Sequence, residues 1–369
     1  MQKLIKFTDL SEQFADNKKP ILTSIYETLE QSNVYGGNSN KLLENFIKKL
    51  YKNANIELTN SGTSALLASL IALDLPKNSR ILTTPITYPA TSQAILGAGC
   101  IPTFVDVDSS WLLDLNDINR VYDFYKDEIS AVLVVDLYGQ GCDIVQLRQW
   151  CDARNLKLII DAAHSFGLTD ENYDQTVADA ICCSLNVSKN FGGLGGGGAV
   201  ITKKINPTKL KAICQVGKEI SGPHGRIDMF GLNLKMTAIQ SSLISANILQ
   251  YENRFNRKVD IIKRFYAAFE NHDSINLPSI SFKNNFNWYI FPIHSDKNLQ
   301  IADALTAANI EFAAHYKYAL HREKFAEKFN PHSCSNAERL TGRIISLPSH
   351  PHLTDSNVDY IIEVVLKSL

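Results

Sequence analysis

The chain has 369 residues, of which 45% are hydrophobic and 20% are charged, and its formal net charge is -1. This composition predicts an ordinary packed core, and the near-neutral charge gives no electrostatic case for binding nucleic acid or an anionic membrane surface. The length suits one large domain and one smaller domain. No run of about 18 apolar residues predicts a transmembrane helix, and the first residues are too polar for a secretory signal peptide.

Strand and helix patterns alternate through the first two thirds of the chain. Short apolar runs bounded by turn residues are typical of a parallel sheet that is covered on both faces. These strand patterns lie at residues 56–60, 81–85, 101–108, 131–139 and 156–161. Apolar residues at helical spacing predict the helices between them, at residues 41–51, 61–73, 87–96 and 143–154. The alternation predicts a three-layer α/β/α domain with a mostly parallel sheet.

Beyond residue 236 the pattern changes to one long helical stretch that reaches residue 269. We expect this helix to join a large domain, residues 1–245, to a small C-terminal α+β domain, residues 246–369. A strand is expected at residues 287–294. No internal repeat or low-complexity linker interrupts the chain.

The seven cysteines are scattered and show no paired Cys-x-x-Cys spacing. Cys182 and Cys183 lie in a pattern typical of a buried strand. Reduced thiols in a cytoplasmic protein are therefore expected, and a zinc site is not. The nine histidines show no metal-ligand spacing, and His350-Pro-His352 is typical of a surface turn. We expect no bound metal.

Two residues in the second third of the chain indicate a chemistry. Asp161 closes an apolar strand pattern, and Lys189 lies just before the glycine run at 192–198. Pyridoxal phosphate (PLP) chemistry requires such a lysine to form a Schiff base and such a carboxylate to keep the pyridine nitrogen protonated. Each residue alone also fits a structural role, as a solvated loop lysine or a helix cap. Spacing alone leaves both interpretations open.

Three further motifs have a functional and a structural interpretation. Residues 61–64, Ser-Gly-Thr-Ser, begin a helix and could bind a phosphate or simply cap that helix. Tyr88, after another strand, could stack on a flat cofactor ring or pack in the core. The glycine run contains the spacing G-x-G-x-x-G, but the strand pattern 199–204 follows it where a dinucleotide site needs a helix. The sequence therefore argues against a Rossmann or P-loop nucleotide site.

With these motifs in order, the chain from about Tyr35 to its C-terminus resembles the DegT/StrS family of PLP-dependent nucleotide-sugar aminotransferases. The resemblance rests on NSGTSALLASLIAL, ILTTPITYPATSQAILGAGCIPTFVDVD, VVDLYGQGCDI, LIIDAAHSFG, SLNVSKNFGGLGGGGAVIT, GLNLKMTAIQSSL, NWYIFPI and ERLTGRIISLPSHPHLTD. It implies fold type I, in which residues 1–245 bind PLP, and a homodimer with two shared active sites.

The resemblance also implies roles for single residues. Lys189 matches the Schiff-base lysine, and Asp161 matches the partner of the pyridine nitrogen. The other implied cofactor contacts are Tyr88 stacked on the ring, His164 near the ring hydroxyl, Gly62, Thr63, Ser64 and Ser184 around the phosphate, Asn186 beside the cofactor, and Asn233 reaching the phosphate of the neighbouring subunit. Substrate contacts are expected from Arg226, Lys235, His315 and Tyr316, for which surface charge or packing is the alternative.

The chain departs from the family pattern at two places. Leu185-Asn186 replaces the usual Phe-His, and glycine at 196 or 197 replaces a usual acidic residue. These departures leave the Schiff-base chemistry intact and put the substrate in question. Lys189 argues against a dehydratase branch that carries histidine at this position.

The resemblance implies transfer of an amino group from an amino acid, glutamate by analogy, to a keto group of a nucleotide-linked deoxysugar. The freed amine of Lys189 would move a proton between the donor and the cofactor. Such a reaction belongs to amino-sugar biosynthesis for a surface polysaccharide or a glycosylated metabolite. Two alternatives stay open: a PLP-dependent dehydratase or lyase that acts on the same sugars, and a non-catalytic regulatory relative that retains PLP.

Overall fold

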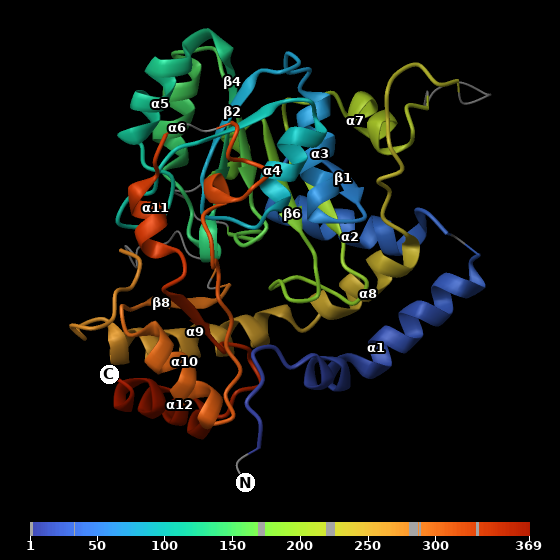
Figure 1. Cartoon of the computed structure of the whole chain (residues 1–369). Coiled ribbons are helices and arrows are strands. Elements are labelled where there is room, and N and C mark those ends of the chain that lie inside the picture. The colour runs from blue at the N-terminus through green and yellow to red at the C-terminus, as the bar shows by residue number, and fades with distance from the viewer. Residues whose placement is uncertain are drawn as a thin grey trace.

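A seven-stranded sheet and a separate two-stranded sheet organise the molecule (Figure 1). The computed structural model describes residues 3–32, 34–168, 174–218, 226–279, 287, 289–329 and 332–369. The strands of the large sheet are β1 (Asn55–Thr59), β2 (Arg80–Thr83), β3 (Ile101–Phe104), β4 (Ile129–Val135), β5 (Lys157–Asp161), β6 (Ala180–Ser184) and β7 (Gly198–Thr202). The small sheet pairs β8 (Phe291–His294) with β9 (Ile344–Leu347) in antiparallel fashion.

The large sheet is mostly parallel, as the sequence predicts. Its order is β1-β7-β6-β5-β4-β2-β3, and the pairs of β7 with β1 and β6 are the antiparallel ones. The remaining neighbours pair in parallel. The carboxyl ends of β2, β4, β5 and β6 therefore meet at one edge of the sheet, where α/β proteins place their ligands.

Helices cover both faces of this sheet. The helices are α1 (Leu10–Glu30), α2 (Gly37–Leu50), α3 (Gly62–Ala72), α4 (Ala90–Gly97), α5 (Asp117–Tyr125), α6 (Ile144–Asp152), α7 (Pro207–Cys214), α8 (Ala238–Ile248), α9 (Tyr251–Phe269), α10 (Asn298–Ala307), α11 (Ser335–Leu340) and α12 (Asp355–Lys367). Alternate residues of β4 enter opposite cores: Val132 and Val134 pack into one, and Leu133 and Val135 into the other. Apolar residues of α3, α4 and α7 complete one core, and those of α2, α5 and α6 complete the other. The expected three-layer α/β/α architecture is confirmed.

The prediction of a single long helix at residues 236–269 is wrong, because the structure divides this stretch into α8 and α9. The helix is interrupted at Leu249 and Gln250. The Arg254 guanidinium donates to the side-chain oxygen of Asn247 at 2.5 Å and also to its main-chain carbonyl near the end of α8. Helical spacing continues on both sides of the break, so the periodicity alone does not reveal it.

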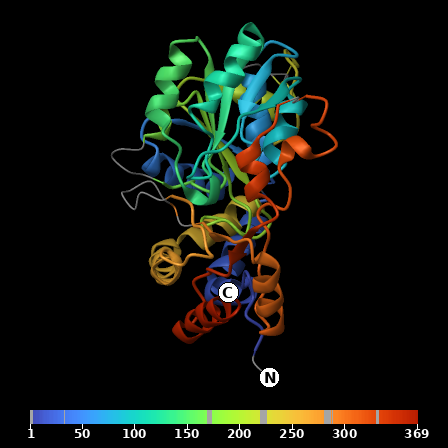
Figure 2. The same cartoon turned by 60° about the vertical axis from the view of Figure 1, so that its left-hand side comes forward.

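The C-terminal part forms a third core below the large sheet (Figure 2). Residues of β8 and β9 pack there against α9, α10 and α12. Ile5 joins the same core, and its backbone pairs with Ile310. The expected strand 287–294 shortens to β8, and Trp288 within it lies outside the described residues. The division at residue 245 falls inside α8 and stays a prediction.

None of the described helices is long and apolar enough to cross a membrane. All seven cysteines are buried and unpaired. The described residues contain no cluster of three or more His, Cys, Asp or Glu side chains that could hold a metal ion.

Candidate active site

Side chains from four segments converge at the carboxyl edge of the large sheet. Asp161 ends β5, His164 follows it, and Lys189 lies in the loop after β6. Burial raises the pKa of Asp161 and lowers the pKa of His164 and of His315 from the C-terminal part, and the charge of Lys189 acts on all three to lower the pKa. The structure therefore brings together residues that the sequence separates by more than one hundred positions.

Asp161 is a buried carboxylate, with 5% of its surface exposed. Oδ2 accepts a hydrogen bond from the Thr91 hydroxyl at 2.8 Å, and Oδ1 accepts one from the Ala163 N–H at 3.1 Å. Burial raises the pKa of Asp161, and these two donors together with Lys189 lower it. Both donors are neutral, so a protonated pyridine nitrogen would supply a charge partner that the two hydrogen bonds do not.

His164 is held as a neutral ring. Its Nδ1 accepts the Tyr138 N–H at 3.1 Å, which leaves the ring proton on Nε2. Burial and the charge of Lys189 hold the pKa of His164 well below its ordinary value. The ring stacks on Tyr289, with 4.4 Å between centroids. His164 can therefore offer one N–H donor to a cofactor oxygen, as the resemblance implies.

The loop that carries Lys189 is shaped by Asn186. The Asn186 carbonyl accepts the Lys189 N–H at 2.8 Å, and its side-chain oxygen accepts the Ser188 N–H at 3.2 Å. Nζ of Lys189 lies 4.2 Å from the ring centroid of Tyr289. Leu185 is fully buried in the core. The Leu185-Asn186 departure thus anchors and folds the loop, while direct contact of Asn186 with a cofactor stays a prediction.

The start of α3, called here the α3 cradle, meets the end of β6 at Ser184. Ser61 caps α3 by accepting the Ser64 N–H at 3.1 Å, so the capping interpretation of this motif is confirmed. A Cβ on Gly62 would lie 2.8 Å from Cβ of Ser184, so only glycine allows this approach. Capping does not exclude anion binding, because a helix start keeps other N–H groups directed at a ligand. The roles of Gly62, Thr63, Ser64 and Ser184 toward the phosphate of PLP stay predictions.

The glycine run allows close packing against neighbouring residues. The prediction that it is not a nucleotide-binding loop is confirmed. Strand β7, and no helix, follows it. A Cβ on Gly193 would lie 2.7 Å from Cα of Ile244, and one on Gly197 would lie 2.6 Å from Cε of Met236. The missing side chains let the loop after Lys189 lie directly against α8.

The structure places the expected substrate residues in two groups. His315 and Tyr316 lie beside the site. The charge of Lys189 contributes to a pKa of about 4 for His315. Asp161 and Tyr88 contribute to a pKa of Tyr316 that is well above its ordinary value. Burial is the largest cause of both shifts. Lys235 lies over the ring of Tyr35 at 4.1 Å, and Arg226 is exposed. No described contact joins either of these two to Lys189.

Tyr88 and Asn233 are exposed. Tyr88 exposes 64% of its surface just before α4, so it is free to cover a cofactor ring. The main-chain oxygen of Asn233 accepts a weak hydrogen bond from the Asn60 side chain at 3.5 Å, close to the α3 cradle. The roles of these two residues toward cofactor and partner subunit stay predictions.

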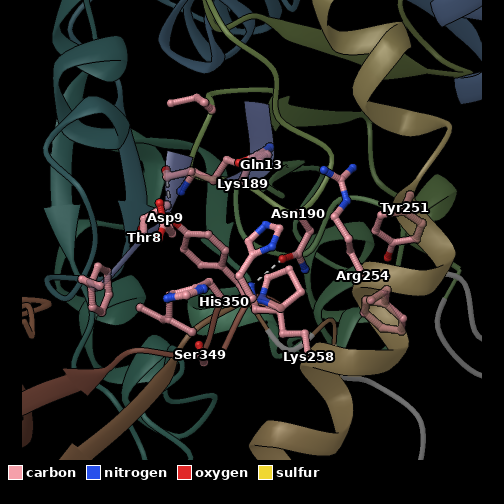
Figure 3. A pocket seen from close by; sticks show the side chains of 18 residues that line it. Thr8, Asp9, Gln13, Lys189, Asn190, Tyr251, Arg254, Lys258, Ser349 and His350 are labelled. Carbon is pink, nitrogen blue, oxygen red and sulfur yellow. Dashed lines mark hydrogen bonds between the residues drawn. The ribbon is translucent and has the colours of Figure 1, made fainter. Parts of the chain in front are cut away.

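Sequence reasoning missed the second wall of the site, which α9 and the segment before β8 form. A cavity of about 90 Å³ adjoins Lys189 there (Figure 3). Tyr289, Arg254 and Lys258 line it. Lys258 donates to Oδ1 of Asn190 at 2.8 Å and lies 5.5 Å from the Tyr289 ring centroid. The motif NWYIFPI signals Tyr289, whereas Lys258 lies among ordinary helical charges and gives no signal.

Comparison with known proteins agrees with this geometry. A family model described as the DegT/DnrJ/EryC1/StrS aminotransferase family matches residues 15–366. A UDP-N-acetyl-3-dehydro-alpha-D-glucosamine 3-aminotransferase of Acidithiobacillus ferrooxidans is 27% identical over 99% of this chain and 98% of its own. A 3-oxo-glucose-6-phosphate:glutamate aminotransferase of Bacillus subtilis is 28% identical over 94% of this chain and 80% of its own. The crystal structure of NtdA from Bacillus subtilis with bound cofactor PMP superposes with a TM-score of 0.88 at 24% identity, covering 96% of this chain and 82% of that one.

Proposed function

The chain belongs to the DegT/DnrJ/EryC1/StrS aminotransferase family, and from this premise we propose that it aminates a keto group on a nucleotide-linked sugar with an amino acid, glutamate, as donor. It is a PLP-dependent aminotransferase of fold type I. The observation that supports the proposal best is the meeting of Lys189 with buried Asp161 and neutral His164 at one edge of the sheet. Both relatives compared above act on sugar ketones by name.

PLP, when bound, supplies an electron sink that stabilises negative charge on the carbon next to the reacting nitrogen. Asp161, held by Thr91 and Ala163, would keep the proton on the pyridine nitrogen of bound PLP. His164 would donate its Nε2–H to the ring hydroxyl oxygen. Lys189 would provide the covalent anchor through Nζ, and its freed amine would take the proton from the α-carbon of the donor and deliver it to the cofactor carbon C4′. Tyr88 would cover the ring, and the α3 cradle with Ser184 would hold the phosphate.

The chain acts as a homodimer in the cytoplasm, in amino-sugar biosynthesis. Exposed Asn233 would contribute to the phosphate site of the partner subunit, and His315 and Tyr316 would contact the sugar nucleotide. Mixing Asn233→Ala with Lys189→Ala protein tests the shared site. Every heterodimer would then carry both defects in one site and none in the other. Recovered activity supports the interface role, and mixed dimers without activity contradict it.

The reaction itself is tested in two halves. PLP-loaded protein is mixed with glutamate alone, and loss of the visible absorbance together with the mass of the pyridoxamine form is measured. The aminated protein is then given a panel of nucleotide 3-keto and 4-keto sugars, with 3-oxo-glucose-6-phosphate included, and products are identified by mass spectrometry. A dehydratase would release water without net amino transfer, and a regulatory relative would leave the cofactor unchanged by every amino acid.

A further inference from the structure

Lys258 is a second, partly buried lysine beside the reactive one. It projects from α9 toward Asn190, the residue that follows Lys189 (Figure 3). Asn190 is itself fixed, because its side-chain nitrogen donates to the main-chain oxygen of Asn287 at 2.7 Å. Both ammonium groups lie near the Tyr289 ring, at 4.2 Å for Lys189 and 5.5 Å for Lys258. The two lysines therefore line one cavity and share one aromatic wall.

The charges around this cavity are unbalanced. Lys189, Arg254 and Lys258 line it, and Asp9 is the acidic residue among the described lining. Asp9 is already neutralised, because Oδ1 accepts from the Lys6 ammonium at 2.9 Å and from the Glu12 N–H at the start of α1. The cavity thus presents an excess of positive charge to whatever enters it.

Lys258 forms no ion pair with a carboxylate of the described residues, and its hydrogen bond goes to the neutral amide of Asn190. Burial and the charge of Lys189 lower the pKa of Lys258 to about 7. A cation that is partly removed from water and has no anionic partner costs a folded protein free energy. A negatively charged ligand would remove that cost and hold the ammonium protonated.

The size of the cavity selects the ligand. Pockets that hold drug-sized ligands measure roughly 300–1,000 Å³, whereas this one measures about 90 Å³, which suits a short acid chain better than a whole nucleotide. We propose that this cavity is the subsite for a carboxylate of the amino-acid donor, and that Lys258 is the specificity-determining cation that pairs with it. This assignment rests on the proposed function, because it presumes that an amino acid reacts at Lys189.

Glutarate, a dicarboxylate that lacks the amino group, probes the subsite without catalysis. Its binding to the PLP-loaded protein is measured by calorimetry for the parent, Lys258→Met, Lys258→Arg and Lys263→Met. Lys263 is an exposed lysine on the same helix and is the matched control. Lys258→Met should weaken glutarate roughly tenfold or more, as expected for the loss of a charge-assisted hydrogen bond. Lys258→Arg should restore most of the affinity, and Lys263→Met should bind like the parent.

Reaction with glutamate in the absence of a sugar gives the second measurement. The half-saturating glutamate concentration should rise by a similar factor in Lys258→Met, while the KM for the sugar acceptor stays unchanged. Equal glutarate and glutamate binding in Lys258→Met and the parent would overturn the subsite. So would a variant whose only defect is a raised acceptor KM, since the cavity would then serve the sugar. Failure of the parent to react with any amino acid would refute the proposed function instead, and glutarate binding would still decide the role of Lys258.

Discussion

The two walls of the site each shield one ionisable group from water, Asp161 almost fully and Lys258 partly, and they differ in how that group is satisfied. On the sheet wall, the Asp161 carboxylate accepts two hydrogen bonds at 2.8 and 3.1 Å from Thr91 and Ala163. On the helix wall, the Lys258 ammonium has one neutral acceptor, Asn190. Burial works against the charged form of both. The difference teaches that the sheet wall is preorganised in the free protein, while the helix wall is completed by a ligand.

Lys189 faces both walls, and removing its amine should give the largest effect. Lys189→Ala should abolish amino transfer and the covalent link to PLP, because the change removes the amine that forms that link. Borohydride reduction followed by peptide mapping checks the link in the parent. A pyridoxyl group found on Lys258 would reverse the roles of the two lysines. Lys263→Ala, on the exposed side of α9, is the control and should retain full activity.

The sheet wall is tested by Asp161→Asn. The amide keeps the shape but loses the charge that holds the ring nitrogen protonated. Amino transfer should fall on the order of a hundredfold or more, comparable to the loss of a preorganised electrostatic partner. The rate of pyridoxamine formation with glutamate measures this, and circular dichroism verifies folding. A rate within a few-fold of the parent would mean that Asp161 has no such role.

A smaller loss of activity should follow when Asp161 is kept and one of its hydrogen-bond donors is removed. Thr91→Val removes the hydroxyl that donates to Oδ2, and activity should fall about tenfold. Because that hydrogen bond lowers the pKa of Asp161, the acid limb of the pH–rate profile should move to higher pH. Thr91→Ser keeps the donor and should restore both rate and profile. An unshifted profile in Thr91→Val would show that Thr91 serves packing only.

The smallest effect is expected for the helix wall, as a change in thermal stability when Lys258 is replaced. Because the pKa of Lys258 is lowered to about 7 in the folded protein, the unfolded chain binds more protons between pH 7 and roughly pH 10. The contribution of Lys258 to the free energy of unfolding therefore rises with pH across this window. Lys258→Met should melt a few degrees above the parent at pH 7, and the gap should close toward pH 10.

Thermal unfolding of both proteins at several pH values measures that gap. Lys263→Met should keep a constant difference from the parent at every pH, since Lys263 is exposed. If the melting temperature of Lys258→Met follows that of the parent at every pH, the pKa of Lys258 is not lowered in the folded protein. The contrast between the two walls would then disappear.

The sequence predicted most of the sheet wall. Asp161 and Lys189 were found because each follows a short apolar run, and the carboxyl ends of parallel strands share an edge. Gly62 and Ser184 were found for the same reason. The helix wall was missed, because Lys258 lies in a charged helix and its surroundings come from the N-terminal segment, the residues just before β8 and residues near 350. Contacts between such distant segments leave no local pattern.

The sequence by itself therefore determined the features that follow from local periodicity. The alternation of strands and helices, the two-faced burial of β4 and the strand-end residues all follow from periodicity and turn chemistry. Tertiary structure alone decided the break between α8 and α9, the Asn186 turn under Lys189, and the partial burial of Lys258 beside it. Those features depend on which surfaces meet in space, and long-range packing sets that meeting independently of the local pattern at either residue.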